Sequence, residues 1–233
     1  MGCLFQIHVA ETQAEVEQTR KVHGLSPVQH LELLGVLNAG ILMVHAIRVD
    51  RKDINLMAER GVGISVTTAS EMKLVSGVAP VPRFLETGFC LGLGTDGCAS
   101  NNNLDMFQEM DLVAKLHKVE NLDPTVLNAR QVLNIATRGG AAAIGLGDEI
   151  GSVEVGKRAD LIIIDTNKPH LTPLYDPCSH LVYAANGSDV RDVIVDGRLV
   201  VENRAVLTMN VDEAIEEVEK LGQQIAYNAQ LLT

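Results

Sequence analysis

The sequence predicts an α/β protein with a parallel sheet, followed by a smaller β part. Four short apolar runs bounded by glycine or polar residues are typical of strands buried on both faces of a parallel sheet. They are Leu4–Val9, Ile41–His45, Val62–Val66 and Cys90–Gly94. Helical patterns separate them, and these cover Glu11–Val22, a segment that begins at Ser26-Pro27, Asp50–Arg60 and Ala79–Glu86. Gly61 and Gly88 are expected to end the last two helices. Strands that alternate with helices predict βαβ units.

The spacing of the strand ends gives a second indication of fold. His8 and Asp96 both end predicted strands, and they lie 88 residues apart over three intervals, or about 29 residues each. A (β/α)8 barrel uses about 31 residues per unit. A doubly wound sheet fits the same spacing, so the spacing alone leaves both folds open.

The predicted secondary structure changes near Leu146–Ile150, where we expect a boundary between the α/β part and the small β part. Before it, Leu104–Val119 has a helical stripe, and Asp123-Pro124 is predicted to cap a helix over Val126–Ala136 that Gly139–Ile144 continues. The glycines of Gly139-Gly140-Ala141-Ala142-Ala143 match no phosphate-binding loop and indicate close helix packing.

After the boundary, the pattern favours strands. Gly151–Asp165 is predicted to form a hairpin-like β segment, and Val190–Val201 a hairpin that turns at Asp196-Gly197. We expect a β layer over Gly151–Val206 with four of its apolar residues buried: Leu161, Ile163, Val193 and Val195. Val211–Leu232 is predicted to be an acidic amphipathic helix.

The composition excludes several classes of protein. With 46% hydrophobic residues among 233, the chain has an ordinary globular composition and is not expected to be disordered. A net charge of −11 without a basic stripe argues against nucleic acid or an anionic membrane as partner. No apolar run approaches the ~18–20 residues of a membrane span. The four cysteines have no CxxC spacing, which favours reduced thiols and a cytoplasmic location: Cys3, Cys90, Cys98 and Cys178.

Residues able to do chemistry follow the predicted strands. They lie at or just past the ends of the strands: His8 and Glu11 at the first, His45 at the second, Thr67 and Thr68 at the third, and Asp96 at the fourth. The carboxyl ends of parallel strands open into one crevice, so these side chains should converge. Imidazole and carboxylate together suit Zn²⁺ or Fe²⁺. A single strand-end histidine is more often a hydrogen-bonded core residue, but three such strand ends favour a site.

Four segments resemble the C-terminal part of the amidohydrolase superfamily, in its methylthioadenosine/S-adenosylhomocysteine deaminase branch with the related chlorohydrolases. They are Ile7–Thr12, Lys73–Val81, Gly94–Asn102, and Gly151–Asp165 together with Val195-Asp196-Gly197. The resemblance implies an α/β fold made of strands five to eight of a (β/α)8 barrel, part of a small β-sandwich and a C-terminal helix. The corresponding domains would be residues 1–147, 148–208 and 209–233.

The resemblance also implies a reaction and its residues. The reaction is hydrolytic deamination of an adenine nucleoside, with one divalent metal, Zn²⁺, in each complete active site. His8 and Asp96 would be metal ligands, and Asp96 would also take a proton from the attacking water. Glu11 would pass a proton to the ring nitrogen, and His45 would orient or polarise the nucleophile. Glu11 and Asp96 would also contact the substrate, a small nucleoside-like molecule.

Three departures from the family pattern leave alternatives open. The His-x-His pair of the first barrel strand is absent, so we expect a C-terminal fragment, inactive alone, that requires a complementing N-terminal half or forms a homo-oligomer. Val66–Glu71 replaces a His-Cys-Pro-like segment that runs into Ser-Asn, and Arg48 replaces a histidine. The alternatives are another amidohydrolase, acting on a triazine or on guanine, and a non-catalytic half-barrel module.

Overall fold

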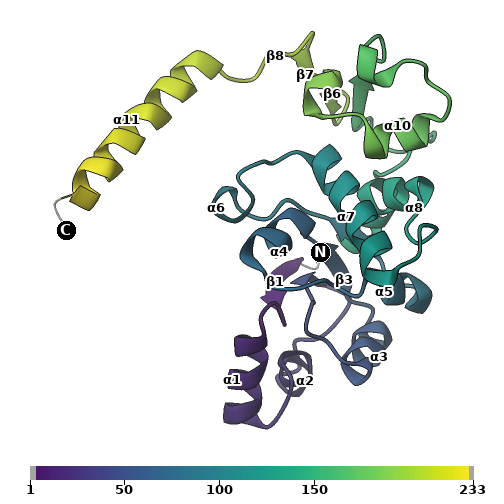
Figure 1. Cartoon of the computed structure of the whole chain (residues 1–233), viewed down its shortest axis with the longest axis vertical. Coiled ribbons are helices and arrows are strands. Elements are labelled where there is room, and N and C mark those ends of the chain that lie inside the picture. Colours follow the sequence, from purple (N-terminus) through teal and green to yellow (C-terminus); the bar gives the residue numbers. More distant parts are fainter. Residues whose placement is uncertain (1–3, 231–233) are drawn as a thin grey trace. The chain divides into compact units, whose positions relative to one another are not determined.

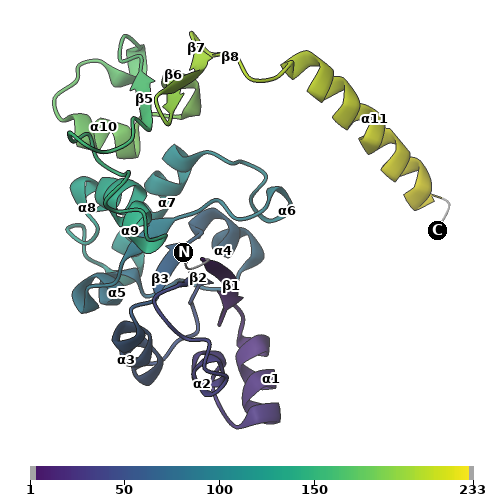
Figure 2. The same cartoon turned by 180° about the vertical axis from the view of Figure 1, so that it is seen from behind.

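The computed structural model describes residues 4–230, which form two compact units (Figures 1 and 2). The larger unit contains Met1–Lys157 and Thr166–Gly187, and the smaller contains Arg158–Asp165 and Ser188–Thr233, in each case as far as the residues are described. Residues 166–187, which the sequence analysis placed in the β part, therefore pack with the α/β part. The division into domains 1–147, 148–208 and 209–233 stays a prediction.

The larger unit is built on a parallel sheet, as predicted. Its strands are β1 (Phe5–Val9), β2 (Ile41–His45), β3 (Gly63–Val66) and β4 (Leu91–Leu93). They pair in the order β1-β2-β3-β4, and every pair is parallel. The four carboxyl ends therefore lie along one edge of the sheet, and this edge carries the candidate site.

The prediction that all four strands are buried on both faces is wrong for β1. Every residue of β2 is buried, whereas Phe5 is 54% exposed and Gln6 and His8 are also exposed. β1 lies at one edge of the described sheet, where it has one neighbouring strand, β2. The other edge strand, β4, stays mostly buried because Gly139 and Gly140 pack against it. An edge strand keeps part of its surface uncovered where no such element packs on it.

Five helices accompany these strands: α1 (Gln13–His23), α2 (Pro27–Leu33), α3 (Arg51–Arg60), α4 (Thr68–Leu74) and α5 (Val81–Thr87). Ser26 and Asp50 cap α2 and α3 through capping boxes, and Gly61 and Gly88 end α3 and α5 in the left-handed conformation, as predicted. Helix α4 was not predicted. It begins with Thr68, Ala69 and Ser70, two of them weak helix formers, and its N-cap residue Thr67 makes no side-chain cap.

Helix α6 (Cys98–Asn101) precedes the long α7 (Met106–Asn121), and then come α8 (Ala129–Asn134), a π-helical turn (Ile135–Gly139) and α9 (Gly140–Ala143). The predicted cap at Asp123-Pro124 is wrong. Asn128 caps α8 in a capping box with Gln131. Asp123 instead accepts hydrogen bonds from the backbone and hydroxyl of Thr125, which closes a local turn.

The glycine-rich segment packs against the sheet, as predicted. A Cβ on Gly139 would lie 2.3 Å from the carbonyl oxygen of Leu91 in β4. A Cβ on Gly63 in β3 would lie 2.2 Å from the carbonyl oxygen of Ala143 in α9. Only glycine allows these backbones to approach so closely.

A buried histidine in α7 gives the larger unit a pH-dependent stability. His117 is 2% exposed, and burial, with the nearby Lys118 charge, lowers its pKa to about 4. In the unfolded chain the His117 ring is therefore protonated below about pH 6.5, whereas in the folded chain it stays neutral down to about pH 4. We expect the free energy of unfolding to fall by up to about 3 kcal/mol as the pH drops through this window.

Urea denaturation of the wild-type chain and of His117→Gln, at neutral pH and near pH 4.5, measures this effect. In His117→Gln, most of this decrease in the free energy of unfolding between neutral pH and about pH 4.5 should disappear. The same substitution at the exposed His170 is the matched control. An equal pH dependence in wild type and His117→Gln would contradict the assignment to His117.

The smaller unit contains a four-stranded antiparallel sheet. Its strands β5 (Leu161–Ile164), β6 (Val190–Val195), β7 (Arg198–Glu202) and β8 (Ala205–Val206) pair in sequence order. The predicted hairpin is confirmed: β6 and β7 flank Asp196 and Gly197, both with positive φ. The predicted hairpin-like β segment over Gly151–Asp165 is confirmed only in its last part, where β5 forms. Residues 151–160 form turns and coil around Gly151 and Gly156, which have positive φ.

The predicted burial of the β layer is also wrong. Ile163 and Val195 are 40% and 49% exposed, and Leu161 and Val193 are only half-buried. The four described strands of this unit form one sheet, and the apolar run of β5 places side chains on both of its faces, including the exposed Ile162. Side chains of a single sheet are buried only where another layer packs on that face.

Further elements complete the description. Helix α10 (Pro177–Tyr183) packs against α7 and α8, 3-10 turns lie at Pro169–Leu171 and Gly187–Asp189, and α11 (Val211–Gln230) is the predicted acidic helix. Leu231 and Leu232, the end of that prediction, lie outside the described residues, as does Cys3. Cys90, Cys98 and Cys178 are free thiols. Within residues 4–230, no helix combines the length and apolar character needed to cross a bilayer.

Candidate active site

Three strand ends present ionisable side chains at one edge of the parallel sheet. His8 lies in β1, His45 is the last residue of β2, and Asp96 follows β4. In the pairing of β1 with β2, His8 is opposite Val44 and Val9 is opposite His45. His45 and Asp96 have positive φ values of 73° and 59°. Non-glycine residues held in this conformation cluster at functional sites.

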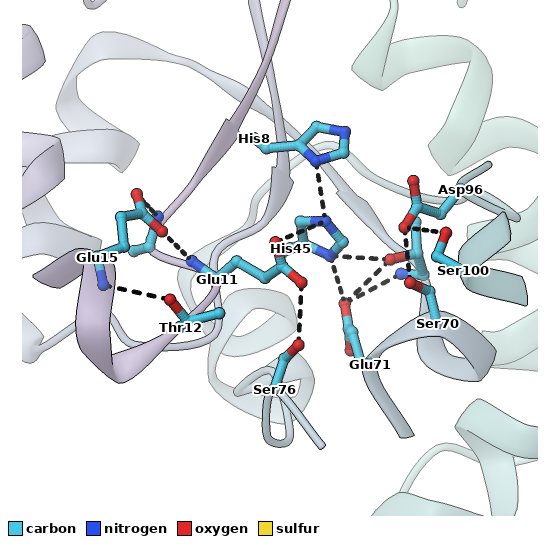
Figure 3. A network of polar contacts seen from close by, with 12 residues as sticks. His8, Glu11, Thr12, Glu15, His45, Ser70, Glu71, Ser76, Asp96 and Ser100 are labelled. Atoms are coloured by element: carbon cyan, nitrogen blue, oxygen red, sulfur yellow. Dashed lines mark hydrogen bonds and ion pairs between the residues drawn. The ribbon is translucent and has the colours of Figure 1, made fainter. Parts of the chain in front are cut away.

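His8, Glu11 and His45 form a compact donor set (Figure 3). One ligand atom of each lies within 4.8 Å of the others. His45 Nε2 is 3.2 Å from His8 Nδ1 and 3.7 Å from Glu11 Oε2. Imidazole nitrogens and carboxylate oxygens are both zinc ligands, so the chemistry of these residues suits a zinc site. The 3.2 Å between the two facing ring nitrogens is a hydrogen-bond distance, which leaves His8 Nε2 for an ion.

Asp96 lines the same cavity as His8, a space of about 370 Å³ that Gln6 and Thr67 also border. It is not one of the three residues of the compact donor set. Its Oδ2 accepts hydrogen bonds from Ser70 Oγ at 2.6 Å and Ser100 Oγ at 2.8 Å.

The charge state of Asp96 follows from these contacts. Burial raises its pKa, but the hydrogen bonds from Ser70, Ser100 and the Gly97 backbone, with the nearby His45, lower it further, and the net pKa lies below the usual value. Asp96 is therefore ionised at neutral pH, as a metal ligand or a proton acceptor must be.

Glu11 is held by contacts that the sequence analysis did not find. Its Oε1 accepts a hydrogen bond from Ser76 Oγ at 2.9 Å. The carboxylate of Glu15 accepts from the backbone N–H groups of Ala10 and Glu11, both at 2.8 Å, and so fixes the turn that carries Glu11 (Figure 3). The available signal was the spacing Thr12-x-x-Glu15 at the start of α1, which is a capping-box pattern.

His45 is fully buried, with 0% exposure. Its Nδ1 is 2.9 Å from Thr67 Oγ1 and 3.4 Å from Glu71 Oε1. Burial lowers the pKa of His45, but the hydrogen bond to Glu71 and the negative charges of Glu11, Glu71 and Asp96 outweigh it, so the net pKa is raised. His45 and Thr67 were predicted as site residues because they follow the pattern of strand ends, whereas Glu71 lies four residues beyond Thr67 and was not predicted.

A second buried carboxylate supports the loop of Asp96. Glu109 of α7 is 1% exposed and accepts hydrogen bonds from the Ala69 backbone at 3.2 Å and from Asn101 Nδ2 at 2.8 Å. Asn101 Nδ2 also donates to the carbonyl of Thr95 at 2.7 Å. Burial raises the pKa of Glu109. This network ties α4, α6 and α7 to the residue before Asp96.

Arg48 occupies the position where the resemblance suggests a histidine. Its guanidinium donates to the carbonyl of Ser76 at 2.5 Å, and its backbone N–H donates to the carbonyl of Ala10 at 2.8 Å. Both acceptors lie beside the residues that hold Glu11. Arg48 therefore connects the turns after β1 and β2 with the loop that carries Ser76.

The family model and the curated relatives that match this chain all belong to the same kind of protein, amidohydrolases and nucleoside deaminases. Residues 1–200 match the amidohydrolase family. The chain is 53% identical over 219 residues to a 5-methylthioadenosine/S-adenosylhomocysteine deaminase of Syntrophobacter fumaroxidans, a match covering 94% of this chain and 50% of that protein. It is 46% identical over 228 residues to a 5'-deoxyadenosine deaminase of Methanosarcina acetivorans, covering 98% and 52%. The chain thus spans about half the length of the curated relatives it matches.

Solved structures are similar over the same extent. An adenosine deaminase from Xanthomonas campestris with bound zinc superimposes with a TM-score of 0.92 at 37% identity, covering 95% of this chain and 51% of that one. An atrazine chlorohydrolase from Arthrobacter aurescens, complexed with zinc, superimposes with a TM-score of 0.86 at 26% identity, covering 93% and 48%.

Proposed function

The chain belongs to the amidohydrolase family, and we propose that it forms part of a zinc-dependent enzyme that deaminates an adenine nucleoside. The observation that carries this proposal is the convergence of His8, Glu11 and His45 at one sheet edge, with Asp96 on the same cavity. The deaminases that the chain resembles suggest methylthioadenosine or S-adenosylhomocysteine as substrate, with 5'-deoxyadenosine as a close variant.

Each site residue receives a role in this proposal. His8 and Asp96 would hold the zinc ion, which when bound activates water for attack on the ring carbon that carries the amino group. Asp96 accepts a proton from the attacking water, and its lowered pKa keeps the carboxylate ionised at neutral pH. Glu11 passes a proton to the ring nitrogen, and His45 orients the nucleophile. Ammonia leaves, and the adenine becomes hypoxanthine.

We further propose that the four strands are half of a (β/α)8 barrel and that the smaller unit is part of a β-sandwich. Catalytic zinc sites have three or more protein ligands, and His8 with Asp96 supplies two. The exposed face of β1 and the half-length match to the relatives support a complementing half, in the same longer protein or in a second chain. That half would supply the remaining ligands.

Reconstitution tests the proposal directly. The 233 residues are fused to, or coexpressed with, the part of the Syntrophobacter deaminase that lies outside the match. We expect zinc-dependent release of ammonia from methylthioadenosine and a shift in ultraviolet absorbance. Each half alone is the control and should be inactive. Robust deamination by this chain alone, or none by the folded and zinc-loaded fusion, would contradict the proposal.

A triazine hydrolase is the second candidate, because the atrazine chlorohydrolase superimposes so closely. Glu11 favours deamination, since a nucleoside ring nitrogen must be protonated as ammonia leaves. Atrazine in the same reconstituted assay separates the two: turnover of atrazine but not of methylthioadenosine would support the triazine reaction.

A further inference from the structure

The buried carboxylate of Glu71 has no part in the reaction described so far. It belongs to α4, is 1% exposed and lies in the segment Val66–Glu71, which departs from the family pattern. An ionisable group this deeply buried needs partners that fix its orientation. The Glu71 carboxylate contacts Thr67 and His45. Figure 3 shows it beside His45.

The hydrogen bonds around Glu71 determine which atoms are donors. Glu71 Oε1 lies 3.1 Å from the backbone nitrogen of Thr67, which can only donate, so this oxygen is an acceptor. It also lies 3.4 Å from Thr67 Oγ1 and 3.4 Å from His45 Nδ1. An acceptor facing Nδ1 is favourable only if that nitrogen carries a proton.

The Thr67 hydroxyl leads to the same assignment. It has one proton and lies 2.9 Å from His45 Nδ1. If Nδ1 donates to Thr67 Oγ1, the hydroxyl proton is free to point at Glu71, and all three groups are satisfied. If the hydroxyl donates to Nδ1 instead, two lone pairs, on Nδ1 and on Glu71 Oε1, face each other in a buried site.

A proton on His45 Nδ1 has a consequence for His8. The neutral His45 ring then has its lone pair on Nε2, which is 3.2 Å from His8 Nδ1. Glu11 Oε2 also faces this nitrogen, but at 3.7 Å it is farther away than His8 Nδ1 and farther than Glu71 is from Nδ1. The favourable short contact at Nε2 therefore has His8 Nδ1 as the donor. The lone pair of the His8 ring then lies on Nε2, the atom remaining for a metal ion. Metal-binding histidines commonly donate their other ring nitrogen in this way.

We propose that Glu71 is a positioning residue: with Thr67 it holds the His45 proton on Nδ1, and through His45 it directs the His8 Nε2 lone pair toward the zinc site. This assignment of protons stands on the contacts alone. Only its effect on turnover rests on the proposed function.

Nitrogen NMR of the 233-residue chain, labelled with ¹⁵N-histidine and kept in alkaline buffer so that the rings are neutral, tests the assignment. Single replacements of His8 and His45 by Gln identify their signals. We expect both wild-type rings to carry the proton on Nδ1. A wild-type His45 ring protonated on Nε2 would overturn the proposal without any variant at Glu71.

Variants at Glu71 test the cause. In Glu71→Met, of similar size but without an acceptor, the Thr67 hydroxyl should donate to Nδ1 and move the His45 proton to Nε2. Glu71→Gln keeps an acceptor oxygen and should preserve the wild-type spectrum. Glu109→Met is the matched control, because Glu109 is equally buried and accepts from Ala69 and Asn101 instead. An unchanged His45 ring in folded Glu71→Met would refute the role of Glu71.

The kinetic consequence is measured separately in the reconstituted enzyme. Loss of a partner that orients a site histidine commonly costs about 10–100-fold in activity. We expect that loss in kcat for Glu71→Met, with a smaller change in KM and near wild-type values for Glu71→Gln. If the NMR result holds and the wild-type fusion is inactive, the proposed function fails and the positioning role stands. If Glu71→Met shifts the His45 proton without lowering kcat, the catalytic consequence is refuted.

Discussion

Replacing Asp96 by alanine should abolish zinc binding and deamination together in the reconstituted enzyme. The proposal gives this carboxylate two roles, zinc ligand and acceptor of the water proton. Ser70, Ser100 and the Gly97 backbone already hold it ionised at the cavity wall. Loss of a general base alone commonly lowers the rate by about 10²–10⁴-fold. Because zinc is lost as well, we expect a larger decrease in the rate of deamination.

Zinc content by elemental analysis and ammonia release, measured on the same preparation, check this expectation. The matched control is Asp148→Ala, which removes an exposed aspartate away from the sheet edge and should leave both quantities unchanged. If Asp96→Ala kept stoichiometric zinc but lost turnover, Asp96 would be a base and not a ligand. Unchanged zinc and turnover would remove Asp96 from the site.

The parallel strands could be predicted because a strand between two neighbours must be apolar on both faces. The run Ile41–His45 is such a strand, and all five of its residues are buried. The same reasoning failed for the burial of β1, since a local pattern does not say whether another element covers a strand at the edge of a sheet, as Gly139 and Gly140 cover β4. It also failed for α4, because Thr68 and Ser70 are weak helix formers whose helix depends on tertiary contacts, such as the Ser70 bond to Asp96.

The candidate site was predictable only in part, for a similar reason. His8, His45 and Asp96 could be found because a parallel sheet brings the ends of its strands together. Glu15, Glu71 and Glu109 look like ordinary helix glutamates in the sequence. Glu71 and Glu109 gain their roles from contacts with distant parts of the chain, such as Glu109 with Ala69, 40 residues apart, which no local pattern encodes. Glu15 contacts residues four and five positions away, and its local signal was the spacing Thr12-x-x-Glu15.

Glu11→Gln should keep zinc bound and still remove most of the turnover. Gln keeps an oxygen that can accept the hydrogen bond from Ser76, and Glu15 still fixes the backbone at Glu11, so the turn should hold its shape. The amide cannot carry a proton from the solvent side to the ring nitrogen. Because acid–base groups contribute about 10²–10⁴-fold, kcat should fall by that factor.

The geometry makes this substitution decisive between two roles, because Glu11 also lies within the compact donor set of His8 and His45. A proton shuttle predicts normal zinc content with low kcat, measured by elemental analysis and ammonia release on one preparation. A metal ligand predicts that zinc is lost in parallel with activity. Glu59→Gln, on the exposed side of α3, is the matched control and should behave as wild type. Parallel loss of zinc in Glu11→Gln would thus move Glu11 from proton transfer to metal binding.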